Sequence, residues 1–334
     1  MRTDNSEDTF LTLSPIFIFS QCIGLGSFKV TGSPRSRRLV FKGVYDKITT
    51  LLFIFYVVLM IFLTKNAFLY FSTTSSPLFM IGWICNLILE LFHFSINIVV
   101  SKYYMRKIVS TYNRLYVIEQ KINNMNNVLN SRFSYWLFLI CIVIDVLMVT
   151  SYSIIFAISG FKDSFIPIYE YVIIFCIMTY MILMQCWTDV RFISFFFVLT
   201  NLFRKIKLHL ITKFFHRSCI RKIWHVKDMN KVNNINILKI CCSLIQDISE
   251  ISRQFNKTIT LQILINYTTH FFFTIIQLYA IITSIVNNKF AITNVWNILS
   301  ICMSVFYVFK LLIVTFVPSL CALQVNIVLI LINV

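Results

Sequence analysis

Apolar residues occur in six long runs along the chain, and polar segments separate them. The runs cover residues 48–64, 78–100, 133–159, 168–187, 259–286 and 292–317. A run of roughly 20 residues crosses about 30 Å of hydrocarbon as a helix. Because backbone groups cannot stay unpaired in lipid, such runs form helices rather than open sheets. The pattern therefore predicts an all-α protein, a polytopic transmembrane helix bundle with six visible spans.

A second helical pattern fills most of the longest polar segment, residues 188–258. Apolar side chains recur every three or four positions from Val232 to Phe255, which is typical of an amphipathic helix. No Pro or Gly separates this pattern from the fifth run. One helix over 232–286 would be about 80 Å long at 1.5 Å per residue. We expect part of it to project from the membrane and to pack against an extension of the fourth run over 191–210.

The basic residues lie almost entirely on one side of the six runs. Of the 30 Lys and Arg residues, 26 fall in segments 1–47, 101–132 and 188–258, and three fall in the other three loops. Cytoplasmic loops carry this excess, so the N-terminus is predicted to be cytoplasmic. G-protein-coupled receptors place the N-terminus outside, and the asymmetry argues against them. It also accounts for the net charge of +17 without nucleic acid as a partner.

Composition supports a chain that folds in lipid. Hydrophobic residues make up 58% of it and charged residues only 13%, which is about half the charged share of soluble domains. We divide the chain into a cytoplasmic N-terminal segment (1–47), the membrane bundle (48–317, with cytoplasmic helical extensions in 188–258) and a short C-terminal tail (318–334). Short outer loops leave the interior of the bundle as the place where an extracellular small molecule would bind.

Polar side chains inside the runs form stripes at helical spacing. One face of the second run carries Asn86, Glu90, His93 and Asn97, and one face of the fifth carries Gln262, Asn266, His270 and Gln277. Asp145 lies near the centre of the third run. Such residues are costly in lipid and should face protein or water. Two interpretations stay open: hydrogen bonds between helices, or a hydrated cavity. Lys310, in the sixth run, is expected to reach the cytoplasmic interface along its own stem.

Catalysis has little support in these stripes. Glu90 and His93 have the spacing of an acid–base or metal pair, but no matching motif occurs on another run. We therefore predict that the protein is not an enzyme, and we expect no metal and no cofactor.

Four stretches of the chain are similar to the insect gustatory receptor family, part of the insect chemoreceptor superfamily. They are SPIFIFSQCIGLGSF at 14–28, WTDVRFISFFFVLTNLFRKIKLHL at 187–210, DISEISRQFNKTITLQILINYTTHFFFTIIQLY at 247–279 and FKLLIVTFVPSLCALQVN at 309–326. Each motif is degenerate alone, and their order and spacing carry the resemblance. Together they extend over nearly the whole chain.

This resemblance implies a seven-helix receptor in the plasma membrane of sensory neurons. It implies a tetrameric, ligand-gated cation channel opened by small-molecule tastants such as sugars or bitter compounds, formed with identical or other gustatory receptor subunits. It also implies a ligand pocket in the outer half of the bundle, for which the candidates are Glu90, Asp145, Tyr152, Tyr180, Gln277, Trp296 and Asn297.

One departure from the family concerns the C-terminal end. The family ends on a seventh, pore-lining helix with a Thr-Tyr-x5-Gln-Phe motif, whereas residues 326–334 carry no such motif and are too short to span a membrane. We therefore expect that the chain lacks the seventh helix. Two alternatives stay open: a membrane transporter, and a non-conducting receptor subunit.

Overall fold

The structure is a computed structural model that describes most of the chain. The described residues are 9–23, 25–26, 28–32, 37–41, 77–125, 132–163, 168–215, 230–286 and 295–333, with a few positions between 47 and 58. The predicted first span, 48–64, lies largely outside them.

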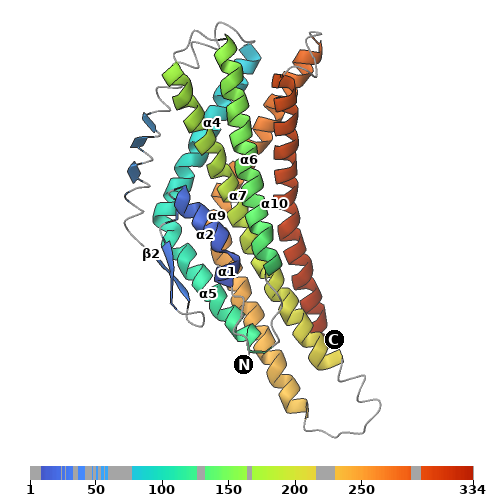
Figure 1. Cartoon of the computed structure of the whole chain (residues 1–334). Helices are drawn as coiled ribbons and strands as arrows, with labels where there is room; N and C mark the ends of the chain where they lie inside the picture. The colour runs from blue at the N-terminus through green and yellow to red at the C-terminus, as the bar shows by residue number, and fades with distance from the viewer. Residues whose placement is uncertain are drawn as a thin grey trace.

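Long helices packed side by side make up an elongated bundle (Figure 1). These helices are α4 (Pro77–Val99), α6 (Arg132–Asp163), α7 (Ile168–Leu210), α9 (Asn230–Val286) and α10 (Val295–Asn333). A π-helical turn, Val100–Tyr104, connects α4 to α5 (Met105–Asn123), and a second one, Ile211–Phe215, follows α7. Ahead of them come α1 (Thr9–Thr12), α2 (Ser14–Cys22), β1 (Phe28–Thr31) and β2 (Arg38–Phe41).

Three of the described helices contain a segment long and apolar enough to cross a membrane. The segments are Thr179–Lys213, Ile235–Thr283 and Ser300–Ile332, and shorter apolar helical stretches occur at Ile88–Val99 and Phe138–Ser151. The prediction of an all-α transmembrane bundle is confirmed. The count of six spans and the cytoplasmic N-terminus stay predictions.

The continuous helices predicted for the long polar segment are present. Helix α9 runs without a break over 57 residues, and α7 continues from the fourth apolar run to Leu210. Helix α10 extends further than the sequence indicated. It passes through Pro318 to Asn333, so the residues that we assigned to a separate tail prolong the sixth helix. Pro318 removes one backbone hydrogen bond from the helix, and Val314 and Cys321 on either side of it are buried in the bundle.

Beyond the apolar runs, α5, α7 and α9 form a core of their own. Phe195 of α7 stacks on Phe255 of α9 with ring centroids 3.5 Å apart, and Tyr112 of α5 meets both rings edge-on. Burial raises the pKa of Tyr112 to about 12, so its hydroxyl stays protonated. A buried ion pair of 3.0 Å between Lys205 and Glu119 joins α7 to α5.

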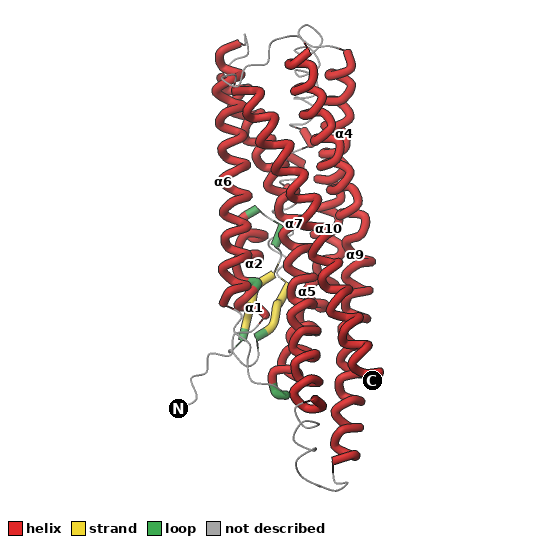
Figure 2. Tube along the Cα trace, turned by 90° about the vertical axis from the view of Figure 1, so that its right-hand side faces the viewer, coloured by secondary structure: helices red, strands yellow, loops and turns green. Residues whose placement is uncertain are grey.

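The N-terminal segment packs against this core. Phe10 stacks on Tyr116, and Phe17 meets Tyr112 edge-on. Figure 2 shows β1 and β2 beside α5. They pair antiparallel, with Phe28 opposite Phe41, and form the one element type that an all-helical prediction missed. Four-residue strands are too short to show alternation, and Asn113 of α5, whose side chain bonds the Leu39 backbone, is distant from them in the sequence.

Candidate functional site

Asp189 of α7 is the centre of a buried polar network. Its side chain is only 2% exposed. Asn266 Nδ2 donates to Asp189 Oδ1 over 2.5 Å, and His270 Nε2 lies 3.0 Å from Asp189 Oδ2. Both partners come from α9, where they are four residues apart and therefore share a helix face. Two residues of the predicted α9 stripe, Asn266 and His270, therefore find their hydrogen-bond partner in an acid on a neighbouring helix.

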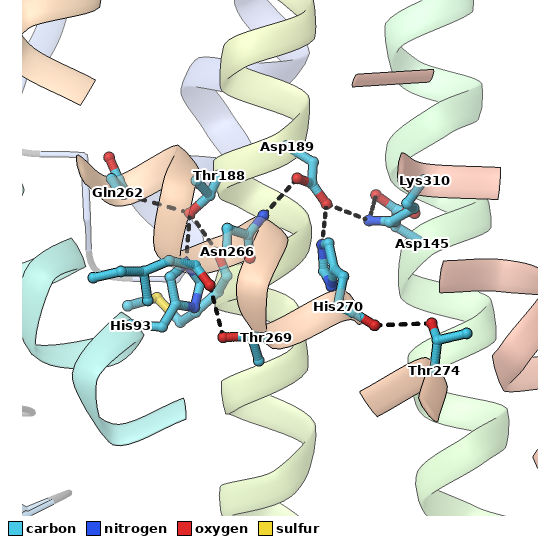
Figure 3. A network of polar contacts seen from close by, with 12 residues as sticks. His93, Asp145, Thr188, Asp189, Gln262, Asn266, Thr269, His270, Thr274 and Lys310 are labelled. Carbon is cyan, nitrogen blue, oxygen red and sulfur yellow. Dashed lines mark hydrogen bonds and ion pairs between the residues drawn. The ribbon is translucent and has the colours of Figure 1, made fainter. Parts of the chain in front are cut away.

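Lys310 of α10 joins two carboxylates from two other helices (Figure 3). Its ammonium lies 3.1 Å from Asp145 Oδ2 of α6 and 3.4 Å from Asp189 Oδ2. Lys310 is only 7% exposed, so the prediction that it reaches the interface along its stem is wrong. A buried cation is tolerated where carboxylates surround it, and here two of them do.

Two residues of the α4 stripe, His93 and Asn97, contact α7 next to Asp189. Thr188 Oγ1, next to Asp189 in the chain, lies 3.1 Å from Asn97 Oδ1 and 3.5 Å from His93 Nε2. Asn97 Nδ2 lies 3.0 Å from His93 Nε2, an arrangement that suits the tautomer in which Nε2 accepts. Gln262 of α9 adds a donor 3.4 Å from Thr188 Oγ1. Thr188 therefore connects α4, α7 and α9.

Arg191 forms the end of the network nearest the core that α5, α7 and α9 build around Phe195 and Phe255, called the projecting core below. Its guanidinium donates to Gln262 Oε1 and lies over the Trp187 ring, 4.2 Å from the centroid. The side chain is buried, and Gln262 thereby bonds both Arg191 and Thr188. A cation stacked on an aromatic face gains attraction that strengthens when water is excluded.

Taken together, these contacts join α4, α6, α7, α9 and α10 at one level of the bundle. Its charged members are the acids Asp145 and Asp189 and the cations Lys310 and Arg191. Its other members are amides, the Thr188 hydroxyl and two imidazoles. In a medium of low polarity these bonds are strong, and a group that loses its partner pays the full cost of desolvation. The arrangement holds five helices in register, and moving one helix would require exchange of partners in the others. A displacement of one helix at this level would therefore be transmitted to the others.

The predicted site residues separate into three groups in the structure. Those that contact one another or a common partner in the network are Asp145, His93, Asn97, Gln262, Asn266 and His270. Glu90 is buried one turn before His93. Two others lie apart: the Tyr180 hydroxyl donates to the Ile23 carbonyl over 2.9 Å, and Gln277 is half-buried on α9. The side chains of Asn86, Tyr152, Trp296 and Asn297 lie outside the described part of the structure.

Direct hydrogen bonds account for several members of the polar stripes at this level. Asn97 and Gln262 both bond Thr188, His270 bonds Asp189, and all three side chains are almost fully buried. These contacts agree with hydrogen bonding between helices, and the choice between that interpretation and a hydrated cavity stays a prediction.

Sequence reasoning missed Thr188, Asp189 and Arg191. They follow the fourth apolar run directly, so we counted them in the cytoplasmic segment 188–258. A signal was present nevertheless: the polar cluster lies between Trp187 and the strongly apolar stretch FISFFFVL, without Pro or Gly. Polar residues enclosed by apolar runs on both sides of one helix are buried more often than solvated.

Comparison with known proteins adds a family-level match. A family model described as 7tm Chemosensory receptor matches residues 13–332. No curated protein matches the chain significantly. The family match includes all of the network residues.

Proposed function

Because the chain belongs to the 7tm chemosensory receptor family, we propose that it is a gustatory receptor, a subunit of a ligand-gated cation channel opened by small-molecule tastants. The family itself establishes the coarser statement: the chain is a membrane chemoreceptor that responds to small molecules, and its family is not one of enzymes. Taste as the sense, the cation path and the assembly into a homo- or hetero-tetramer are parts of the proposal.

The proposed ligand pocket lies at the end of the bundle away from the projecting core. Tyr152 lies in the C-terminal half of α6, Gln277 lies near the C-terminal end of α9, and Trp296 and Asn297 lie in the first turn of α10. Helix direction therefore brings these positions toward the same end. The short outer loops 65–77, 160–167 and 287–291 supply no separate binding domain, which supports binding within the bundle. Glu90, Asp145 and Tyr180 lie deeper and would form the lower part of this pocket.

The observation that carries the gating proposal is the position of the Asp189 network. Helices α7 and α9 run from the apolar segments through the network and into the projecting core as single rods. A ligand that displaced α6 or α10 at the outer end would change the distances from Asp145 and Asp189 to Lys310. Since α7 and α9 are rigid, the change would reach the core formed around Phe195 and Phe255.

Location and orientation complete the proposal. We place the receptor in the plasma membrane with the N-terminus in the cytoplasm, on the charge asymmetry of the sequence. The projecting core would then lie in the cytoplasm, where subunits could assemble through it.

The proposal is tested by expressing the full chain in cells, alone and with other gustatory receptor subunits, and recording Ca²⁺ influx during a panel of sugars and bitter compounds. We expect at least one compound to evoke influx, and Gln277→Ala to shift its dose–response curve. Thr268→Ala is the matched control, because the Thr268 hydroxyl bonds the Leu264 carbonyl of its own helix. Surface-expressed chain without influx under every condition, or saturable uptake of the compound without influx, would refute the channel proposal.

A further inference from the structure

A basic groove opens on α5 just beyond the end of α4. It has a volume of about 500 Å³ and is lined by Arg106, Arg114 and Lys121 together with Ser110, while Asp247 of α9 forms part of the opposite wall. The three cations lie on one side of α5 because spacings of eight and seven residues keep them within about 80° of one another around the helix axis. The lining therefore carries three positive charges against one negative.

Two of these cations are held in position by neighbouring side chains. The Arg106 guanidinium lies over the Phe41 ring, 5.2 Å from the centroid, and so uses the hairpin as a support. Arg114 Nη1 donates to Gln254 Oε1 of α9 over 3.0 Å. A guanidinium has five N–H donors, so each Arg keeps several for a ligand. Cations fixed in this way lose less conformational freedom when an anion binds.

The groove lies next to the membrane surface. Tyr103 and Tyr104, in the turn that connects α4 to α5, are 70% and 37% exposed. Exposed Tyr at the end of an apolar helix is typical of the membrane–water interface. Arg106 follows within one turn, and Arg114 lies about 12 Å further along the helix axis at 1.5 Å per residue. The groove thus extends from the level of the lipid headgroups outward.

We propose that this groove binds a multiply phosphorylated inositol headgroup. Arg side chains bind phosphate through two parallel hydrogen bonds, and the Lys ammonium binds it as a point charge. Asp247 cancels the attraction of about one cation, and the remaining positive charge of the lining favours an anion with several negative charges over a singly charged one. A membrane lipid would present this headgroup at the level of Arg106, and a soluble inositol phosphate carries the same chemistry.

The test uses the purified full chain in neutral detergent micelles and a fluorescent short-chain bisphosphorylated inositol lipid, with binding followed by anisotropy against empty micelles. Unlabelled short-chain phosphatidylserine at equal total charge serves as a competitor. We expect it to displace the probe at least about tenfold less well, because it offers no clustered phosphates. Equal displacement by the serine lipid would overturn the proposal.

Soluble inositol trisphosphate identifies the source of the headgroup. If inositol trisphosphate displaces the fluorescent probe at the same concentration as the unlabelled inositol lipid does, the site is supported and its ligand is assigned to the aqueous phase. Displacement only at much higher concentration supports the site and assigns its ligand to the membrane.

Three variants separate the groove from a general effect of charge. Arg106→Gln with Lys121→Gln is expected to weaken binding about tenfold or more, since two of the three cations of the lining are lost. Lys107→Gln removes one positive charge from the same helix outside the groove, where Lys107 lies over Tyr104, and is expected to change affinity less than about twofold. Asp247→Asn should tighten binding, a gain that a damaged fold would not give. Equal weakening by Lys107→Gln, or no gain with Asp247→Asn, would refute the proposed site.

Discussion

Of the single changes to the buried network, removal of the Lys310 ammonium should lower the stability of the fold most. In Lys310→Met the apolar stem is kept, and Asp145 and Asp189 lose the cation that lies 3.1 Å and 3.4 Å from them. A unit charge pair at 3.1 Å interacts by about 5 kcal/mol at an effective dielectric constant of about 20. Breaking a buried ion pair by removal of one partner costs about 3–5 kcal/mol in measured cases. Both values predict a large loss of stability.

The double variant Lys310→Met with Asp145→Asn should recover much of that loss. It removes the second charge as well, and Asp189 keeps Asn266 and His270 as partners. Replacing a complete buried pair by neutral groups of similar volume is often close to neutral. The double variant is therefore predicted to be more stable than Lys310→Met alone.

The assay is thermal unfolding of the purified full chain in detergent. At about 2 °C per kcal/mol for a chain of this size, Lys310→Met should lower the apparent Tm by about 6–10 °C. Lys257→Met, at an exposed position of α9, is the control and should shift it by about 1 °C or less. A Lys310→Met variant that melts with the wild type, or a double variant no more stable than the single one, would refute the reasoning.

Three further predictions test the core, the hairpin and the topology. Phe255→Ala should lower the free energy of unfolding by about 3–5 kcal/mol because the ring is fully buried against Phe195. Phe271→Ala, which removes an exposed ring, should lower it by about 1 kcal/mol or less. Equal losses would contradict the assigned core. Asn113→Ala removes two hydrogen bonds to the Leu39 backbone, of 2.8 Å and 3.0 Å, and should speed amide exchange at 38–41 about 30-fold, with Ser110→Ala as the unchanged control. An epitope tag at Met1 should bind antibody only after cells are permeabilised, and staining of intact cells would reverse the proposed orientation.

The sequence predicted the long helices well because their pattern is local. Apolar periodicity and the absence of Pro and Gly define α9 over nearly its whole length, and the fourth apolar run likewise continues into the rest of α7. Where the pattern ended, the prediction stopped too early: α10 passes through Pro318 because packing outweighs one lost backbone bond.

The candidate site was predicted only in part because half of it depends on partners from other helices. The stripes on α4 and α9 were visible, since spacing alone assigns His93, Asn97, Asn266 and His270 to helix faces. Spacing does not reveal that Asp189 of α7 accepts from α9, nor that Lys310 turns inward to two acids. A lone Lys near the end of a predicted apolar run satisfies the snorkelling rule equally well, and only the tertiary structure distinguishes the two cases.

The central claim of this account is that the Asp189 network transmits ligand binding to the cation path. The most direct measurement is the current that an activating tastant evokes in cells expressing Asp189→Asn, compared with wild-type chain at equal surface density. Asn keeps the shape of the side chain but removes the charge that His270 and Lys310 contact. The account predicts a current at least about tenfold smaller, or an activation curve shifted by a similar factor, as expected from the loss of about 1.4 kcal/mol or more of coupling. An unchanged activation curve with unchanged maximal current would contradict it.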